Sequence, residues 1–172
     1  MQIIGKGEWL EIVKHHGFEY AHEIRGTKAV AVLGVDKNDR YRVLVRYEMN
    51  PAKGSLELSM ASLTGGVEEG ESPRKAAMRE LREEAGIKKS PKDFQLLGAP
   101  VWGFKMSDTK YWMYVVMLEG TESGLGLGDG TSGESGAYCT WMSIEDAING
   151  SGDTVLSAIC GRWIMALLSG KA

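Results

Sequence analysis

The order of apolar and polar residues along the chain predicts short strands near both ends and one well-marked helix in the middle. Mixed apolar and polar positions over 8–24 predict two short strands. Two β-branched runs, 28–35 and 41–47, flank the polar turn 36–39 and predict a hairpin. An apolar pattern resumes at 56–63, after Pro and Gly interrupt it. Further strands are expected at 94–97, 111–118 and 138–142.

The helix of the middle region is expected over residues 72–86. Ser72 suits the N-cap, Pro73 suits the first helical position, and Gly86 suits a left-handed residue at the C-terminal end. Apolar residues recur every fourth position along it, which gives a narrow stripe that faces inward. Two further helices are expected, a short one opening at 143–146 and an amphipathic one over 154–168.

Strands and helices intermingle without the regular alternation of a doubly wound fold. The sequence therefore predicts an α+β fold, with a mixed sheet between helices as in an α/β/α sandwich. The chain has 172 residues and shows neither a repeat nor a linker, so we expect a single domain over residues 1–172.

Composition and charge exclude several classes of protein. With 43% hydrophobic and 25% charged residues, the chain is neither disordered nor fibrous. A net charge of −3 provides no basic field for DNA, and no apolar run approaches the roughly 18 residues of a membrane helix. Cys139 and Cys160 lack CxxC spacing, so we expect buried free thiols and a cytoplasmic protein.

Three carboxylates gather on one face of the expected helix. Glu80, Glu83 and Glu84 stand at i, i+3 and i+4, so they lie side by side and repel one another. Clustered oxygen ligands on a rigid element suit Mg²⁺ or Mn²⁺, which would remove that repulsion. Arg79 precedes Glu83 by four residues and can hold one carboxylate through a charge-assisted bond.

Glycine is over-represented, with 23 residues in the chain, and it concentrates in two segments. The loop 64–71 brackets its acidic residues with glycine and leads into the helix, where backbone groups can approach a metal or a phosphate. Residues 120–136 hold seven glycines and predict a long mobile loop. A Glu-rich helix face alone is more often plain solvated surface. The loop and the helix together are the more specific signal, and they predict a site for a diphosphate and a metal.

Residues 65–87 resemble the Nudix box. The box pattern is G-x5-E-x7-R-E-U-x-E-E-x-G-U, in which U is a bulky apolar residue, and the chain matches every specified position from Gly65 to Ile87. The resemblance implies an α/β/α sandwich that hydrolyses a nucleoside diphosphate linked to another group, using Mg²⁺ or Mn²⁺. It also implies roles for the box residues.

By position in the box, Glu80 and Glu84 correspond to the main metal ligands. Glu83 corresponds to a further ligand or to a base that orients water, and a carbonyl of Thr64 or Gly65 completes the inner shell. The resemblance implies that Arg79 orients a box glutamate, Glu71 supports the loop, and Gly86 ends the helix.

The flanking segments resemble the ADP-ribose and nucleoside-diphosphate-sugar pyrophosphatase branch. That likeness implies an N-terminal strand arm over 1–26, a homodimer, and products that are a nucleoside monophosphate and a sugar phosphate. It implies a loop glutamate as general base, with Glu134 the first candidate and Glu122 the second. Substrate contacts are expected from Arg46, Gly66 and Trp102. The alternatives are hydrolysis of nucleoside triphosphates or dinucleoside polyphosphates, and a nucleotide-binding domain without activity.

Overall fold

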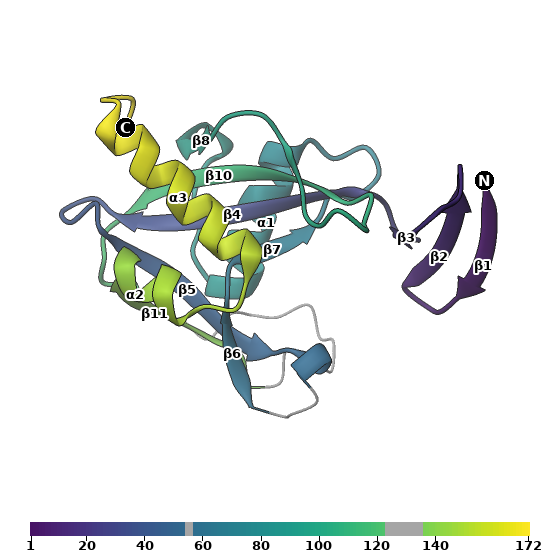
Figure 1. The fold of residues 1–172 in the computed structure, drawn as a ribbon. Helices are drawn as coiled ribbons and strands as arrows, with labels where there is room; N and C mark the ends of the chain where they lie inside the picture. The colour runs from purple at the N-terminus through teal and green to yellow at the C-terminus, as the bar shows by residue number, and fades with distance from the viewer. Residues whose placement is uncertain (54–56, 123–135) are drawn as a thin grey trace.

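A large mixed sheet lies between helices, and a smaller sheet extends from its side (Figure 1). The structure is a computed structural model that describes residues 1–53, 57–122 and 136–172. The large sheet has the strand order β11-β5-β4-β10-β8, with β6, β7 and β9 paired at its margins. Its strands are β4 (Lys28–Asp36), β5 (Arg42–Met49), β6 (Leu58–Ala61), β7 (Leu63–Gly66), β8 (Phe94–Leu96), β9 (Val101–Trp102), β10 (Lys110–Leu118) and β11 (Tyr138–Ser143).

The centre of the sheet is a parallel pair, and its other pairings are antiparallel. β4 and β10 run parallel along their whole lengths, from Lys28–Lys110 to Asp36–Leu118. β4 and β5 form the predicted hairpin, but they pair only near the turn, at Gly34–Leu44 and Val35–Val43. Beyond that point the two strands separate, since β4 takes β7 as its neighbour and β5 takes β6. The sheet therefore splits at the end from which the glycine loop emerges.

Helices cover both faces of the sheet, as the predicted sandwich requires. α1 (Pro73–Ala85) packs on one face, where Leu81 joins a buried cluster with Val30 and Leu44. α2 (Ile144–Gly150) and α3 (Thr154–Leu168) pack on the other face. Figure 1 shows α3 crossing the near side of β4 and β10, with α1 behind them. Because both faces are covered, β4 is buried almost throughout, as is usual for a central strand.

The ends of α1 confirm the predicted caps. The Ser72 hydroxyl accepts a hydrogen bond from the backbone N–H of Lys75. Gly86 adopts a φ of 70°, and its N–H donates to the Arg82 carbonyl at 3.0 Å. A residue with a Cβ is strained in that conformation, so glycine fixes where the helix ends.

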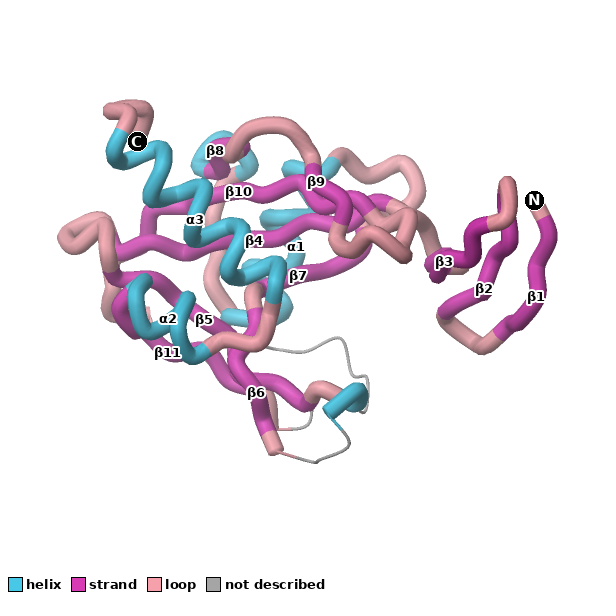
Figure 2. Tube along the Cα trace, in the orientation of Figure 1, coloured by secondary structure: helices cyan, strands magenta, loops and turns pink. Residues whose placement is uncertain are grey.

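The N-terminal residues form a three-stranded antiparallel sheet, called the arm below, of β1 (Gln2–Lys6), β2 (Leu10–His15) and β3 (Phe18–Glu23). The sequence predicted only the last two strands, because the first lacks a regular alternation and its register shifts between Ile3 and Gly5. The tube in Figure 2 shows the arm as strands and turns beside the large sheet. It is joined to the body by His22, whose Nδ1 lies 2.7 Å from Asp108, and by a β-bridge between Ala21 and Ser107.

One prediction from composition also matches the described residues. Cys139 and Cys160 are both buried and free. Among the helices that the structure describes, none is long and apolar enough to cross a membrane.

Candidate active site

The glycine loop and α1 enclose a hollow of about 340 Å³, called the carboxylate hollow below. β7 delivers the loop to the start of α1, because β7 pairs with the central strand β4 and α1 packs against both. The hollow is lined by Arg25, Thr64, Gly65, Gly66, Val67, Glu68, Arg79, Glu80, Glu83 and Glu84. The fold thus brings together the box residues that the sequence proposed for metal binding.

Arg79 connects the loop to the carboxylates of the helix. Its Nη1 lies 2.5 Å from Glu80 and 3.0 Å from Glu83, and its Nη2 donates to the Gly66 carbonyl at 2.7 Å. Its Nε and Nη2 also donate to the Glu71 carboxylate, at 3.3 and 3.1 Å. Burial alone would lower the pKa of Arg79, but these carboxylates outweigh burial and raise it. The guanidinium therefore stays charged and fixes the loop relative to α1.

Glu80 lies directly against the backbone of the glycine loop. A Cβ on Gly65 would overlap the Glu80 carboxylate, so only glycine permits this approach. A Cβ on the neighbouring Gly66 would meet nothing within 4 Å. Burial raises the pKa of Glu80 to about 7, even though Arg79 opposes this effect.

Glu84 is held deeper, where α1 meets β5 and β7. Its Oε2 accepts the Thr64 N–H at 2.9 Å, and its Oε1 lies 3.5 Å from the Nε of Arg46. Burial raises the pKa of Glu84 well above its usual value, and the charges of Glu80 and Glu48 add to the rise. Glu80 and Glu84 are therefore two buried carboxylates at the base of one hollow, each with a raised pKa.

This donor set fits a hard divalent cation. The side-chain ligands are carboxylate oxygens, and the strand beside them has bare glycine backbone, which suits Mg²⁺ or Mn²⁺. In the described part of the chain, no three acidic, His or Cys side chains converge as a ready-made metal cluster. The guanidinium of Arg79 lies between Glu80 and Glu83 and bonds to both. A cation would supply positive charge to Glu80 and Glu84, whose pKa values burial raises.

The structure does not bring every proposed residue to this hollow. Arg46 is 2% exposed and lies behind Glu84, so it faces the ligand set rather than the space where a substrate would enter. Trp102 is 58% exposed on β9 and lines a different hollow with Phe18 and Phe104. Their roles as substrate contacts stay predictions.

Of the two proposed loop bases, only Glu122 can be placed. Glu134 lies outside the described residues. The Glu122 carboxylate accepts the N–H groups of Glu119 and Thr121, at 2.9 and 3.2 Å. Burial raises its pKa, but the surrounding backbone N–H groups outweigh burial and lower it. A carboxylate engaged in its own turn in this way is a poor proton acceptor.

Arg25 also lines the carboxylate hollow, and it is not among the site residues predicted from the sequence. It stands between the arm and β4, about 40 residues before the box, and its guanidinium lies 3.8 Å above the Trp9 ring. No motif links Arg25 to the glutamates along the chain. Only the folded position of the arm brings it near them.

Comparison with known proteins identifies the family. The pattern of the NUDIX domain matches residues 26–157. The chain belongs to the Nudix family. RNA pyrophosphohydrolases from three strains of Cereibacter sphaeroides are each 32% identical to this Nudix chain in an alignment of 98 residues that covers 49% of this chain. That alignment spans 59% of those relatives, so this chain covers less than two thirds of their length.

A solved structure resembles the whole Nudix chain in fold. It is the crystal structure of an ADP compounds hydrolase, with a TM-score of 0.70 at 15% sequence identity. The likeness covers 99% of this chain and 92% of that one. The arm is therefore part of the shared fold, which confirms the α+β sandwich with an N-terminal strand arm.

Proposed function

We propose that this protein is a metal-dependent hydrolase of the diphosphate in ADP-ribose or a related nucleoside-diphosphate sugar. The observation that carries the proposal is the pair Glu80 and Glu84, two buried carboxylates with raised pKa values at the bare backbone of Gly65. Groups tuned in this way are characteristic of sites that hold a cation and act on phosphates. The similarity in fold to an ADP compounds hydrolase, which includes the arm, supports this substrate class.

In this proposal Glu80 and Glu84 would hold the ion, and Glu83 would be a further ligand or would orient the attacking water. A divalent cation held there would neutralise the diphosphate and lower the pKa of water. Arg79 keeps Glu80 and Glu83 in position through its two bonds. Water attacks one phosphorus atom and the bridging oxygen leaves with the other phosphate. The products are a nucleoside monophosphate and a sugar phosphate.

A second candidate is pyrophosphohydrolysis of a nucleoside triphosphate or a dinucleoside polyphosphate. The RNA pyrophosphohydrolases of Cereibacter sphaeroides support it, since they share 32% identity with this chain over 98 residues. The same carboxylates would serve this reaction, because the bond broken is again a phosphoanhydride. The two candidates therefore differ in how the rest of the substrate is bound.

The test is a screen of the purified chain with Mg²⁺ or Mn²⁺ against ADP-ribose, nucleotide sugars, nucleoside triphosphates, dinucleoside polyphosphates and 5′-triphosphorylated RNA. Faster turnover of ADP-ribose or nucleotide sugars is the expected result, and a preference for triphosphates would establish the second candidate. Glu84→Gln should remove nearly all activity. The matched control is Glu69→Gln, the same chemical change on an exposed box residue, which should retain it. Failure of every substrate would overturn the proposal.

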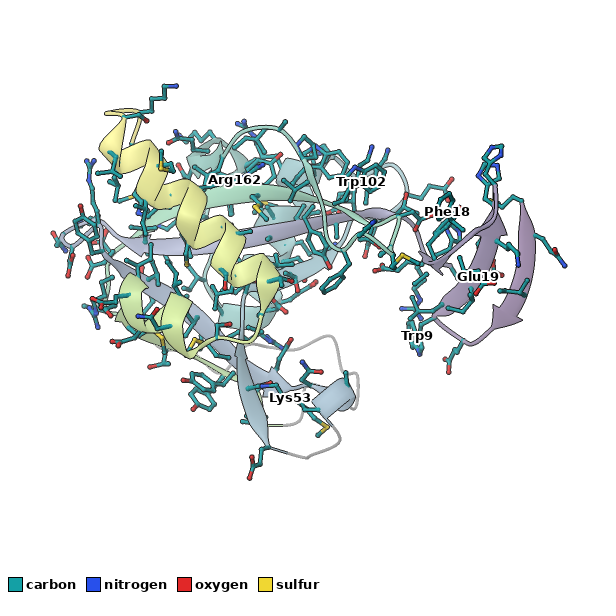
Figure 3. All side chains as sticks on the ribbon, in the orientation of Figure 1. Trp9, Phe18, Glu19, Lys53, Trp102 and Arg162 are labelled. Carbon is teal, nitrogen blue, oxygen red and sulfur yellow. The ribbon has the colours of Figure 1, made fainter. Side chains whose placement is uncertain are left out.

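We also propose that the arm forms a homodimer interface. It exposes a large apolar surface for so small a sheet, with Ile3, Trp9 and Phe18 at 52%, 47% and 74% exposure. Figure 3 labels Trp9 and Phe18 on the arm. Analytical ultracentrifugation should find a dimer, and Phe18→Asp should shift it toward monomer. A monomeric wild type would overturn this interface. Location in the cytoplasm remains a prediction.

A further inference from the structure

A second hollow, of about 510 Å³, adjoins the carboxylate hollow on the outer side of α1. Arg79 and Glu83 line both hollows, so these two side chains form the ridge between them. A ligand seated at the carboxylates has only this ridge to cross to reach the second space. The second hollow is lined by Glu71, Lys75, Met78, Arg79, Arg82, Glu83, Lys88 and Lys89.

Four cationic side chains, Lys75, Arg82, Lys88 and Lys89, gather around this space, which is called the basic hollow below. Lys75 and Arg82 stand seven residues apart on α1, so they share one face of the helix. Lys88 and Lys89 lie just beyond the end of the helix, three and four residues after Ala85. Within residues 1–53, 57–122 and 136–172, none of these four has an acidic partner within 4.0 Å.

The carboxylates in the same hollow are fewer than its cations. They are Glu71 and Glu83, both bonded to Arg79 at 3.1 and 3.0 Å, so positive charge remains in excess. The chain as a whole has a net charge of −3, so the positive charge of the basic hollow is opposite to the net charge of the protein. Neighbouring unpaired cations repel one another, and a bound anion removes that repulsion.

We propose that the basic hollow binds phosphate groups that the substrate carries beyond the hydrolysed diphosphate. Lys and Arg are the usual protein ligands of phosphate, and several of them along a groove can contact successive phosphate groups of an extended anion. The inference rests on the proposed function and narrows it. The preferred substrate is a nucleoside diphosphate-linked compound that bears at least one further phosphate group.

The direct test measures binding of inorganic tripolyphosphate to the full chain by titration calorimetry in low salt with a metal chelator. With the chelator present, no divalent cation can bridge the anion to the acidic residues of the carboxylate hollow, so binding reports on the basic hollow. Lys88→Gln/Lys89→Gln should weaken binding about fivefold or more, because each exposed cation contributes a modest Coulomb attraction. The matched control is Lys105→Gln/Lys171→Gln, the same charge change at exposed positions outside both hollows, which should bind as the wild type does.

A kinetic test uses pairs of substrates that differ only by a further phosphate group, such as ADP-ribose and its phosphorylated derivative. The wild type should favour the phosphorylated member in kcat/KM. That preference should fall about fivefold in Lys88→Gln/Lys89→Gln and persist in the control variant. Equal tripolyphosphate binding by both variants, or an unchanged preference, would overturn the inference. If no diphosphate is hydrolysed at all, the proposed function fails, while the tripolyphosphate result still decides the hollow.

Discussion

Arg46 on β5 and Glu84 on α1 form a buried ion pair behind the carboxylate hollow, with the Nε of Arg46 3.5 Å from the Oε1 of Glu84. Their side chains are 2% and 8% exposed, and Arg46 also donates to Glu48 at 2.7 Å. A buried charge is tolerated only when paired. The pair therefore ties a proposed metal ligand to the central sheet.

Removing this arginine should destabilise the protein and impair metal binding together. Arg46→Met leaves two carboxylates without their partner, so we expect a loss of about 3–5 kcal/mol in the free energy of unfolding by urea. Mn²⁺ affinity, measured by calorimetry, should also fall, and Arg46→Lys should restore part of both. Arg42→Met removes a half-exposed arginine from the same strand and should cost far less. Wild-type stability in Arg46→Met would contradict this role.

The approach of Glu80 to Gly65 predicts contrasting effects at two adjacent glycines. Gly65→Ala should displace the Glu80 carboxylate, because the new Cβ would occupy its position. We expect Mn²⁺ affinity to fall about tenfold or more, which corresponds to about 1.4 kcal/mol. Gly66→Ala adds the same methyl group in open space and should retain the affinity. Similar affinities in the two variants would show that the contact does not position the ligand.

The raised pKa of Glu80 predicts that metal binding depends on pH. Its value of about 7 in the folded chain exceeds the ordinary 4.5, so the metal-free protein should lose stability as pH rises between those values. A cation must displace this proton, so affinity should increase as pH rises toward 7. Calorimetry in buffers of different ionisation enthalpy should detect protons released on Mn²⁺ binding at pH 6, and fewer released protons at pH 8.5. Glu80→Gln should reduce the release. Release of the same number of protons at both pH values would refute the prediction.

The two loop glutamates should differ in their effect on turnover. Glu134→Gln should lower kcat by about 10²-fold or more if Glu134 is the general base, with little change in KM. Glu122→Gln should have a small effect, since that carboxylate accepts hydrogen bonds from its own turn. Steady-state kinetics on the best substrate of the screen will decide. The reverse outcome would assign the base to Glu122.

Asp153 should contribute to stability from the opposite side of the sheet. Its carboxylate accepts the N–H of Val155 at 2.7 Å at the start of α3, and both the N–H and the hydroxyl of Ser62. Asp153→Ala removes a helix cap and leaves Ser62 without its acceptor, so we expect a loss of about 2–3 kcal/mol. Asp153→Asn should lose less. Urea unfolding checks this, and a change below about 0.5 kcal/mol would contradict it.

Local signals determined much of the fold from the sequence. The caps Ser72 and Gly86 fixed α1 because they act within one turn of the helix, and the hairpin followed from its polar turn. The first strand of the arm was missed, since it pairs only with β2 and has no regular alternation. The spacing of the box residues indicated the family from the sequence alone. Helical periodicity was enough to place Glu80, Glu83 and Glu84 on one face of α1.

Only the tertiary structure decided which side chains surround the glutamate-bearing face of α1. Arg46 precedes Glu84 by 38 residues, and Arg25 is farther still from the box, so no local rule connects them. The split between β4 and β5 sets the Thr64 N–H against Glu84 and the bare backbone of Gly65 against Glu80. Burial, which raises the pKa values of both glutamates, depends on packing from the whole sheet. The sequence alone predicts which glutamates are the candidate ligands, and the fold decides how deeply they are buried and therefore their pKa values.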